Sequence, residues 1–255
     1  SEAKNFLNGI VEKNPILNSR ILENHLKNKS NKFEDIEDIN KRLIDSLSNR
    51  NMMKSVIGFS DKEKEMKKIL FNYNPGSILK KYSNESELFM EFQKYFNIKN
   101  AESKNNLWKT FSKGILSGCE FLSNFKNKEE FDEFINKFSF NKYTKAALPM
   151  LLSKEIRGFG FALSCDFLKE LGYRSYPKPD VHLIKIFYEL ELSDSKKDYE
   201  VYKSLVEMAE TTGEEAYKID KILWLISSGN FYLNNIKIKR NRDNFIERMK
   251  DILKI

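Results

Sequence analysis

The chain has 255 residues and a mass of 30.1 kDa, which is enough for one large domain or two small lobes. Its net charge of +7 at pH 7 and pI of about 9.1 favour polyanionic partners, although a lysine-rich composition alone also produces such a surplus. Because no run approaches ~18 consecutive apolar residues and only two cysteines are present, the composition argues against a membrane-spanning protein and a disulfide-stabilised secreted domain.

Apolar residues recur at helical spacing in nearly every segment. In residues 33–49 an apolar residue returns every three or four positions, which draws one stripe along a helix. Residues 60–73 open with Ser60 and Glu63 at the spacing of a capping box and end at a proline–glycine turn. Further helices are predicted over residues 85–96, 106–125, 129–138, 143–156, 161–171, 180–190, 198–210, 214–229 and 242–253. With no alternating strand pattern, the sequence predicts an all-α fold of about ten to twelve helices.

Three regions are expected along the chain. Residues 1–100 form an N-terminal helical region that packs with the C-terminal helices, and residues 101–177 form a helical lobe that ends shortly after a glycine-rich turn. Residues 178–255 supply the C-terminal helices. There is no fixed repeat and no long linker, so residues 27–32 and 97–106 are the best candidate joints.

Gly158 and Gly160 bracket Phe159 in the segment IRGFG, in a chain that has only 10 glycines. The segment predicts a helix, a tight turn and a second helix, with Phe159 turned inward to hold the turn against the core. Two glycines before a helix let backbone N–H groups point outward together, an arrangement that binds phosphate. Lys154 and Arg157 add positive charge suited to a DNA backbone. An ordinary helix–helix turn is the alternative interpretation.

Asp180 lies twenty residues after Gly160, directly behind a proline and at the start of an apolar helix. The two motifs IRGFG and KPDVH resemble the helix–hairpin–helix DNA glycosylase superfamily, in which a Leu-Pro-Gly-Val-Gly turn is followed at this distance by a Pro-Val-Asp-x-His segment. The resemblance covers residues 142–188 and extends loosely to residues 107–122, whereas the N-terminal hundred residues carry no motif of the family. Arg157 stands where the family has proline. The resemblance implies a two-lobed, all-α fold, here without the iron–sulfur cluster, because the cysteines are too few.

The resemblance makes Asp180 the catalytic residue of a base-excision DNA glycosylase. In such enzymes a nucleotide rotates out of the duplex, and the bond between its base and C1′ is broken. Positive charge builds on the sugar, so an ionised Asp180 stabilises it and orients or deprotonates the attacking water. The alternative role of Asp180 is the N-cap of the following helix. The two roles are compatible, because a capping aspartate stays ionised and fixed.

Bifunctional members of the superfamily carry a lysine just after the hairpin, whose amine attacks C1′ as a Schiff-base nucleophile. Ala162 occupies that position, neither Phe161 nor Leu163 supplies an amine, and Lys169 lies two helical turns along. The resemblance therefore implies a monofunctional DNA glycosylase without lyase activity, which uses water, releases an alkylated or oxidised purine and leaves an abasic site. The alternative is a catalytically inactive helix–hairpin–helix DNA-binding protein with a degenerate or lysine-replaced 8-oxoguanine glycosylase-like site.

His182, two residues past Asp180, is expected to contact the DNA backbone through phosphate or sugar, or else to pack on its helix. Trp108, Phe121 and Tyr176 are the candidate aromatic residues of a base pocket, because a flipped base stacks on such rings. Within the resemblance, the DVH segment leans towards the 8-oxoguanine branch and Ala162 towards the alkylpurine branch. The resemblance therefore implies either an oxidised or an alkylated purine as the damaged base and does not decide between them.

No cofactor and no metal site are expected. The two histidines are far apart in sequence and the two cysteines form no CxxC pair, so the chain offers no zinc ligand set. The expected partner is double-stranded DNA that contains a damaged base, bound by a monomer, with no membrane partner. The low cysteine count favours a reducing, cytoplasmic setting.

Overall fold

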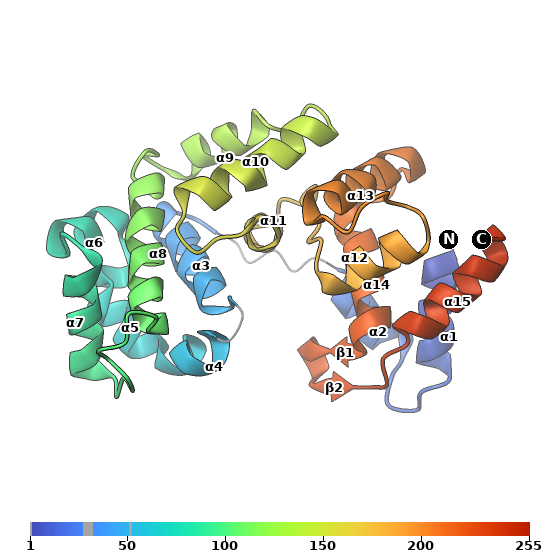
Figure 1. The fold of residues 1–255 in the computed structure, drawn as a ribbon, viewed down its shortest axis with the longest axis horizontal. Helices are drawn as coiled ribbons and strands as arrows, with labels where there is room; N and C mark the ends of the chain where they lie inside the picture. The colour runs from blue at the N-terminus through green and yellow to red at the C-terminus, as the bar shows by residue number, and fades with distance from the viewer. Residues whose placement is uncertain (1, 28–32, 51–52) are drawn as a thin grey trace. The chain divides into compact units, whose positions relative to one another are not determined.

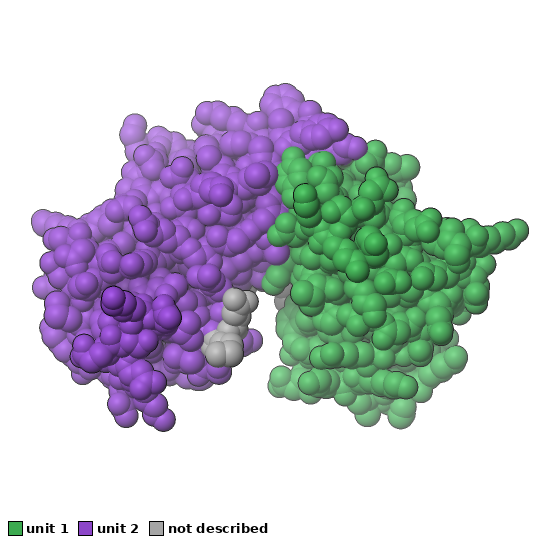
Figure 2. All heavy atoms as spheres, in the orientation of Figure 1, with its two compact units in different colours: residues 1–30, 172–255 green, residues 31–171 purple. Residues whose placement is uncertain are grey.

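The computed structural model describes residues 2–27, 33–50 and 53–255, and it is helical almost throughout (Figure 1). By its internal contacts the chain forms two compact units, which Figure 2 shows in different colours. Unit 1 consists of residues 1–30 and 172–255, and unit 2 of residues 31–171. The prediction of an all-α, two-lobed fold is confirmed.

Unit 2 is built around one long buried helix, α8 (Leu107–Leu122). This helix contacts α3 (Ile36–Ser48), α4 (Met53–Ile57), α6 (Pro75–Lys81), α7 (Glu85–Tyr95) and α10 (Lys142–Glu155). The other elements of unit 2 are α5 (Glu63–Ile69), α9 (Lys128–Asn136), α11 (Phe161–Glu170) and the 3-10 turns η1 (Ser60–Lys62) and η2 (Phe71–Tyr73). A Cβ atom on Gly118 would lie 2.5 Å from Cδ2 of Leu43, so the close approach of α8 to α3 requires glycine there.

Unit 1 is centred on α14 (Ala216–Ser228). This helix packs against α1 (Glu2–Glu12), α2 (Ser19–Leu26), α12 (Val181–Glu189), α13 (Asp198–Thr212) and α15 (Arg242–Leu253). The core of unit 1 includes Leu7, Leu22, Leu183, Phe187, Leu205, Ile226, Phe231 and Phe245. Two short antiparallel strands, β1 (Asn230–Phe231) and β2 (Ile236–Lys237), flank the 3-10 turn η3 (Tyr232–Asn234). The sequence did not predict these strands, because two residues are too few to show alternation.

The structure groups the chain differently from the three expected regions. Helices α1 and α2 pack with α14 in unit 1, whereas α3 to α7 belong with α8 in unit 2. One boundary between the units falls at residues 171 and 172, and the expected joint at 97–106 lies inside unit 2. The other boundary falls within the expected joint at 27–32, most of which lies outside the described residues.

Asparagine and aspartate cap many of the helices. The side-chain oxygens of Asn18, Asp35, Asn74, Asn84, Asn106, Asn127, Asn141 and Asp180 accept hydrogen bonds from backbone N–H groups of the helices that they precede. The capping box predicted at Ser60 and Glu63 is wrong, because Ser60 begins the turn η1 and α5 starts only at Glu63 without a side-chain cap. A capping box is formed instead by Asn141 and Thr144.

Candidate functional site

The glycine hairpin joins α10 to α11 within unit 2. The backbone N–H of Phe159 donates to the carbonyl oxygen of Ile156 at 3.0 Å and closes a tight turn. Gly158 has a φ of +96°, a conformation that L side chains rarely adopt, so glycine is required there. Gly160 has an ordinary φ of −106° and serves as the N-cap residue of α11. The predicted helix–turn–helix arrangement is therefore present, and the two glycines have different reasons to be glycine.

The hairpin is held against α8 by contacts that were not predicted. The backbone N–H of Arg157 donates to Oγ of Ser117 at 2.8 Å. A Cβ atom on Gly114 would lie only 2.8 Å from the carbonyl oxygen of Arg157, so the turn rests directly on the α8 backbone. The small residues of the sequence GILSG were the available signal, since glycines in a helix interior usually mark a close approach.

Phe159 points inward, as predicted. Its side chain is buried, and its ring lies edge-on to Phe167 of α11 with ring centroids 5.6 Å apart. Ile156, at the other end of the turn, is fully buried. The turn is therefore anchored at both ends by apolar side chains; Gly160 is exposed, whereas Gly158 is partly buried against Leu47.

The N-terminus of α11 is accessible to a ligand. Its N-cap residue is a glycine, which brings no side chain to cap the helix. Gly160 is exposed, and a Cβ atom built there would meet no atom within 4 Å. The positive end of the helix dipole therefore lies beside open space, which suits an anion.

Three positively charged side chains lie at or near the hairpin. Lys154 and Arg157 are exposed, as a role in binding the DNA backbone requires. Arg50, which follows α3, brings its guanidinium close to the turn: Nη1 lies 3.4 Å from the position of a Cβ atom on Gly158. Sequence reasoning missed Arg50, because more than a hundred residues separate it from the hairpin and only the packing of α3 against α11 brings it there.

Ala162 is the second residue of α11 and is partly exposed. The downstream lysine of the same helix, Lys169, is buried, and its Nζ lies 3.2 Å from Oδ1 of Asp166. This ion pair directs the Lys169 amine towards its own helix. The expectation that Lys169 points away from the position of the family lysine is consistent with this pairing.

Asp180 is the N-cap of α12 in unit 1, so that predicted role is confirmed. Its Oδ1 accepts hydrogen bonds from the backbone N–H groups of His182 at 2.9 Å and Leu183 at 3.1 Å. Burial raises the pKa of the Asp180 carboxyl above its usual value, and the nearby Asp220 carboxylate raises it further. The cap bonds and His182 act in the opposite direction, but burial is the largest effect. The expectation that the cap alone keeps Asp180 ionised is therefore incomplete.

Asp220 of α14 supports the segment that carries Asp180. It is buried, and its Oδ2 accepts a hydrogen bond from the backbone N–H of Lys178 at 2.9 Å. Asp220 therefore holds the backbone just before Asp180 and adds to the effect of burial on the Asp180 pKa. No local pattern in the sequence marks Asp220, because it is 40 positions from Asp180.

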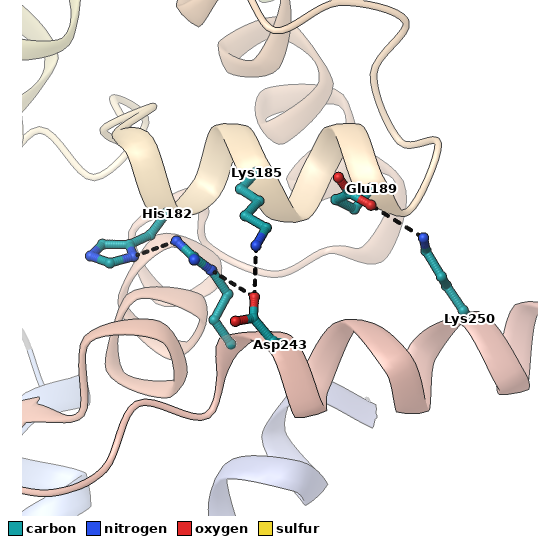
Figure 3. A network of polar contacts seen from close by, with 6 residues as sticks. His182, Lys185, Glu189, Asp243 and Lys250 are labelled. Carbon is teal, nitrogen blue, oxygen red and sulfur yellow. Dashed lines mark hydrogen bonds and ion pairs between the residues drawn. The ribbon is translucent and has the colours of Figure 1, made fainter.

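His182 belongs to a row of polar contacts between α12 and α15 (Figure 3). Nη1 of Arg242 approaches Nδ1 of His182 at 3.4 Å, and Lys185 Nζ donates to Oδ1 of Asp243 at 2.8 Å. Burial lowers the pKa of His182, and the cations Arg242 and Arg240 lower it further, against the opposing effect of the Asp180 carboxylate. His182 is therefore disposed to be neutral near pH 7.

The three candidate base-pocket residues are all buried. The Trp108 ring stacks on Phe96 with centroids 5.1 Å apart, and the Phe121 ring lies edge-on to Phe125 at 5.5 Å. Both side chains pack inside unit 2, and Tyr176 is buried in unit 1. These contacts describe packing, and a role in base recognition stays a prediction.

The site residues divide between the two units. Gly158, Gly160, Lys154, Arg157, Ala162, Trp108 and Phe121 belong to unit 2, whereas Tyr176, Asp180 and His182 belong to unit 1. Across the ranges that the structure describes, no cluster of three or more His, Cys, Asp or Glu side chains suits a metal ion. Over the same ranges, no helix has both the length and the apolar character needed to cross a membrane.

Among known proteins, the likeness to this chain is one of structure. No family model matches the chain, and no curated protein matches it. Among solved structures, the chain is similar to the crystal structure of an 8-oxoguanine glycosylase/lyase from Methanocaldococcus jannaschii in complex with a 15mer DNA containing 8-oxoguanine. The match covers 94% of each chain, at 17% sequence identity and a TM-score of 0.46.

Proposed function

We propose that this chain is a monofunctional DNA glycosylase that removes a damaged purine from duplex DNA. The observation that carries the proposal is the pairing of an accessible, glycine-lined hairpin with an aspartate fixed at a helix N-terminus twenty residues later. The first motif suits a phosphate of the DNA backbone, and the second suits a reaction that builds positive charge on a sugar.

In the proposed mechanism, the hairpin amides bind a backbone phosphate while Lys154 and Arg157 add favourable charge. The damaged nucleotide leaves the stack, which brings its C1′ to Asp180. As the bond between C1′ and the base breaks, the bonding electrons leave with the base, and the Asp180 carboxylate stabilises the positive sugar. The oxygen of a water molecule bonds to C1′ and loses a proton, and the base takes up a proton. The products are a free base and an abasic site.

Ala162 is the reason for proposing that the enzyme is monofunctional. Its methyl side chain cannot form a Schiff base with C1′, and the Lys169 amine is buried in an ion pair. Without an amine at this position, base release is not followed by cleavage of the strand. The proposed enzyme therefore acts as a hydrolase without lyase activity.

The test is base release from defined duplexes. The protein is incubated with duplexes that carry alkylated adenine, 8-oxoguanine, uracil or an adenine·8-oxoguanine mispair, and abasic sites are revealed by alkali. Release from at least one duplex is expected, with strand breaks only after alkali. Asp180→Asn is expected to abolish release and to keep DNA binding. If the folded wild-type protein binds DNA but releases none of these bases, the proposed activity is wrong for them.

A second candidate function is a DNA-binding protein without catalysis. The observation that favours it is Ala162 at the position of the family lysine, together with burial that raises the pKa of Asp180 and opposes its ionisation. This alternative predicts that the protein binds DNA in a salt-sensitive way and that Asp180→Asn leaves this binding unchanged. The glycosylase predicts the same binding together with an absolute requirement for Asp180 in base release.

A further inference from the structure

Four cations gather in a short segment of unit 1 between β2 and α15. We call residues 237–242 the basic ridge; they read Lys-Ile-Lys-Arg-Asn-Arg and include no carboxylate. Lys237, Lys239 and Arg240 are exposed, and no ion pair involves any of the three within the described part of the chain. The fourth cation, Arg242, interacts with the neighbouring Asp243 at 3.4 Å.

The backbone of the ridge is hydrogen-bonded to the end of α14. The N–H of Ile238 donates to the carbonyl oxygen of Gly229 at 2.8 Å, and the N–H of Asn241 donates to that of Ile226 at 3.0 Å. A Cβ atom on Gly229 would lie 2.5 Å from the Ile238 oxygen, so the ridge lies directly on the end of α14. The cationic side chains therefore project from a fixed backbone, which lowers the entropy cost of binding a partner.

The ridge adjoins the helix cap that holds Asp180. Arg242 contacts the ring of His182, in the row of contacts drawn in Figure 3, and His182 donates its backbone N–H to Asp180. Arg240 is also close enough to act electrostatically on His182. A run of positive charge thus begins beside the proposed catalytic residue and continues along the surface of the same unit.

We propose that the basic ridge is a further contact surface for the DNA backbone, supplied by unit 1 beside Asp180. This inference rests on the proposed function, because it assigns the ridge to the duplex that Asp180 acts on. Lysine and arginine side chains without carboxylate partners attract phosphates and release their counterions when they bind. A rigid row of them positions a duplex without reading its sequence.

The experiment compares two triple variants that remove the same charge. Lys237→Gln/Lys239→Gln/Arg240→Gln changes the ridge, and Lys64→Gln/Lys80→Gln/Lys81→Gln changes exposed lysines of α5 and α6. Affinity for an undamaged duplex is measured between about 50 and 200 mM salt. For each phosphate that the altered ridge no longer neutralises, the salt slope is expected to fall by about 0.9 and the affinity about eightfold near 0.1 M salt. The control is expected to match the wild type.

The outcomes separate this inference from the proposed function. If the ridge variant binds like the control while the wild type binds with a clear salt dependence, the ridge inference is wrong and the proposed function is unaffected. If the ridge variant binds weakly but Asp180→Asn still releases bases, the ridge stands and the catalytic assignment fails. A wild-type protein without salt-sensitive DNA binding overturns both. Should the triple variant fold poorly, the single variant Lys239→Gln gives the same comparison for one phosphate.

Discussion

The Asp220 carboxylate accepts a hydrogen bond from the backbone N–H of Lys178 at 2.9 Å, two residues before Asp180. The same buried carboxylate acts with burial to raise the pKa of Asp180. Asp220 therefore has two separable effects on the proposed catalytic residue, one on position and one on ionisation.

Replacing Asp220 by asparagine is expected to separate those effects. Asp220→Asn keeps an oxygen that accepts from Lys178 and removes the negative charge, so the pKa of Asp180 falls towards its usual value. If base release needs ionised Asp180, the acidic limb of the pH–rate profile moves to lower pH. Asp220→Leu removes the hydrogen bond as well and is expected to lower the rate at every pH. An Asp220→Asn profile that coincides with the wild type would show that Asp220 has only a structural role.

Asp180→Asn is expected to lose activity without losing stability. Asparagine caps a helix about as well as aspartate, so the bonds from His182 and Leu183 are retained. Burial raises the pKa of Asp180 in the folded state. The ionised carboxylate therefore destabilises the fold at pH values above the usual carboxyl pKa, and this penalty is absent at low pH. The free energy of unfolding of Asp180→Asn at pH 7 should therefore equal or exceed that of the wild type, with the difference shrinking towards pH 4.

Asp180→Ala provides the contrast. It removes both the charge and the cap, and the loss of a cap costs about 1 kcal/mol. Urea unfolding at pH 7 should place Asp180→Ala below Asp180→Asn by about that amount. Equal stabilities for the two variants would mean that the cap contributes little to α12.

The two hairpin glycines are expected to respond differently to alanine. Gly158→Ala places a side chain at a φ of +96° and should destabilise the fold by about 1–3 kcal/mol. Gly160→Ala meets no atom within 4 Å, so it should change the unfolding free energy by less than about 1 kcal/mol. It should nevertheless weaken DNA binding, because its methyl group occupies the space through which a phosphate approaches the α11 amides. Normal DNA affinity in a stable Gly160→Ala variant would exclude that approach.

His25 is expected to make unit 1 sensitive to acid. The ring is buried, and its two hydrogen bonds require a neutral imidazole. Nδ1 donates to the Ile21 oxygen at 2.8 Å, and Nε2 accepts from the Leu233 N–H at 3.2 Å. Burial and the cation of Lys221 lower its pKa from 6.5. The unfolded chain therefore takes up a proton first, so stability present above about pH 6.5 is lost as the pH falls below it.

The measurement is the urea midpoint at a neutral and an acidic pH. The midpoint of the wild type should fall on acidification, and that of His25→Gln should fall by less, because one titrating group has been removed. His182 has a lowered pKa as well, so the variant keeps part of the effect. An identical pH dependence in the two proteins would contradict the assignment to His25.

Local features of the site were predictable from the sequence because local rules determine them. Gly158 marks a turn because glycine tolerates its positive φ, Phe159 turns inward because a tight turn must be anchored, and Asp180 caps a helix because its position suits that role. Helical periodicity likewise located the long amphipathic helices. The structural role of a residue could therefore be predicted from the sequence where its contacts are with its neighbours along the chain.

Features that depend on distant packing were not predictable. Ser117 and Gly114 support the hairpin from 40 or more positions away, and Asp220 accepts from Lys178 across 42 positions of the chain. The pairing of α1 and α2 with α14 makes unit 1 discontinuous, which no local pattern encodes. The basic ridge has the composition of an ordinary solvated linker, and only its anchoring to Gly229 and its contact with His182 single it out.

The most direct test of the proposed chemistry is to supply the missing amine. Ala162→Lys places a primary amine at the second residue of α11, where helix N-terminal charge favours its neutral, nucleophilic form. If Asp180 and the hairpin act on one nucleotide, this amine is expected to attack C1′ and form a Schiff base, which borohydride traps as a covalent protein–DNA complex. Strand cleavage should then accompany base release without alkali. Ala162→Gln, similar in length but without an amine, should give neither result. A stable Ala162→Lys protein that releases bases but cannot be trapped would place the α11 N-terminus too far from C1′ for the proposed site.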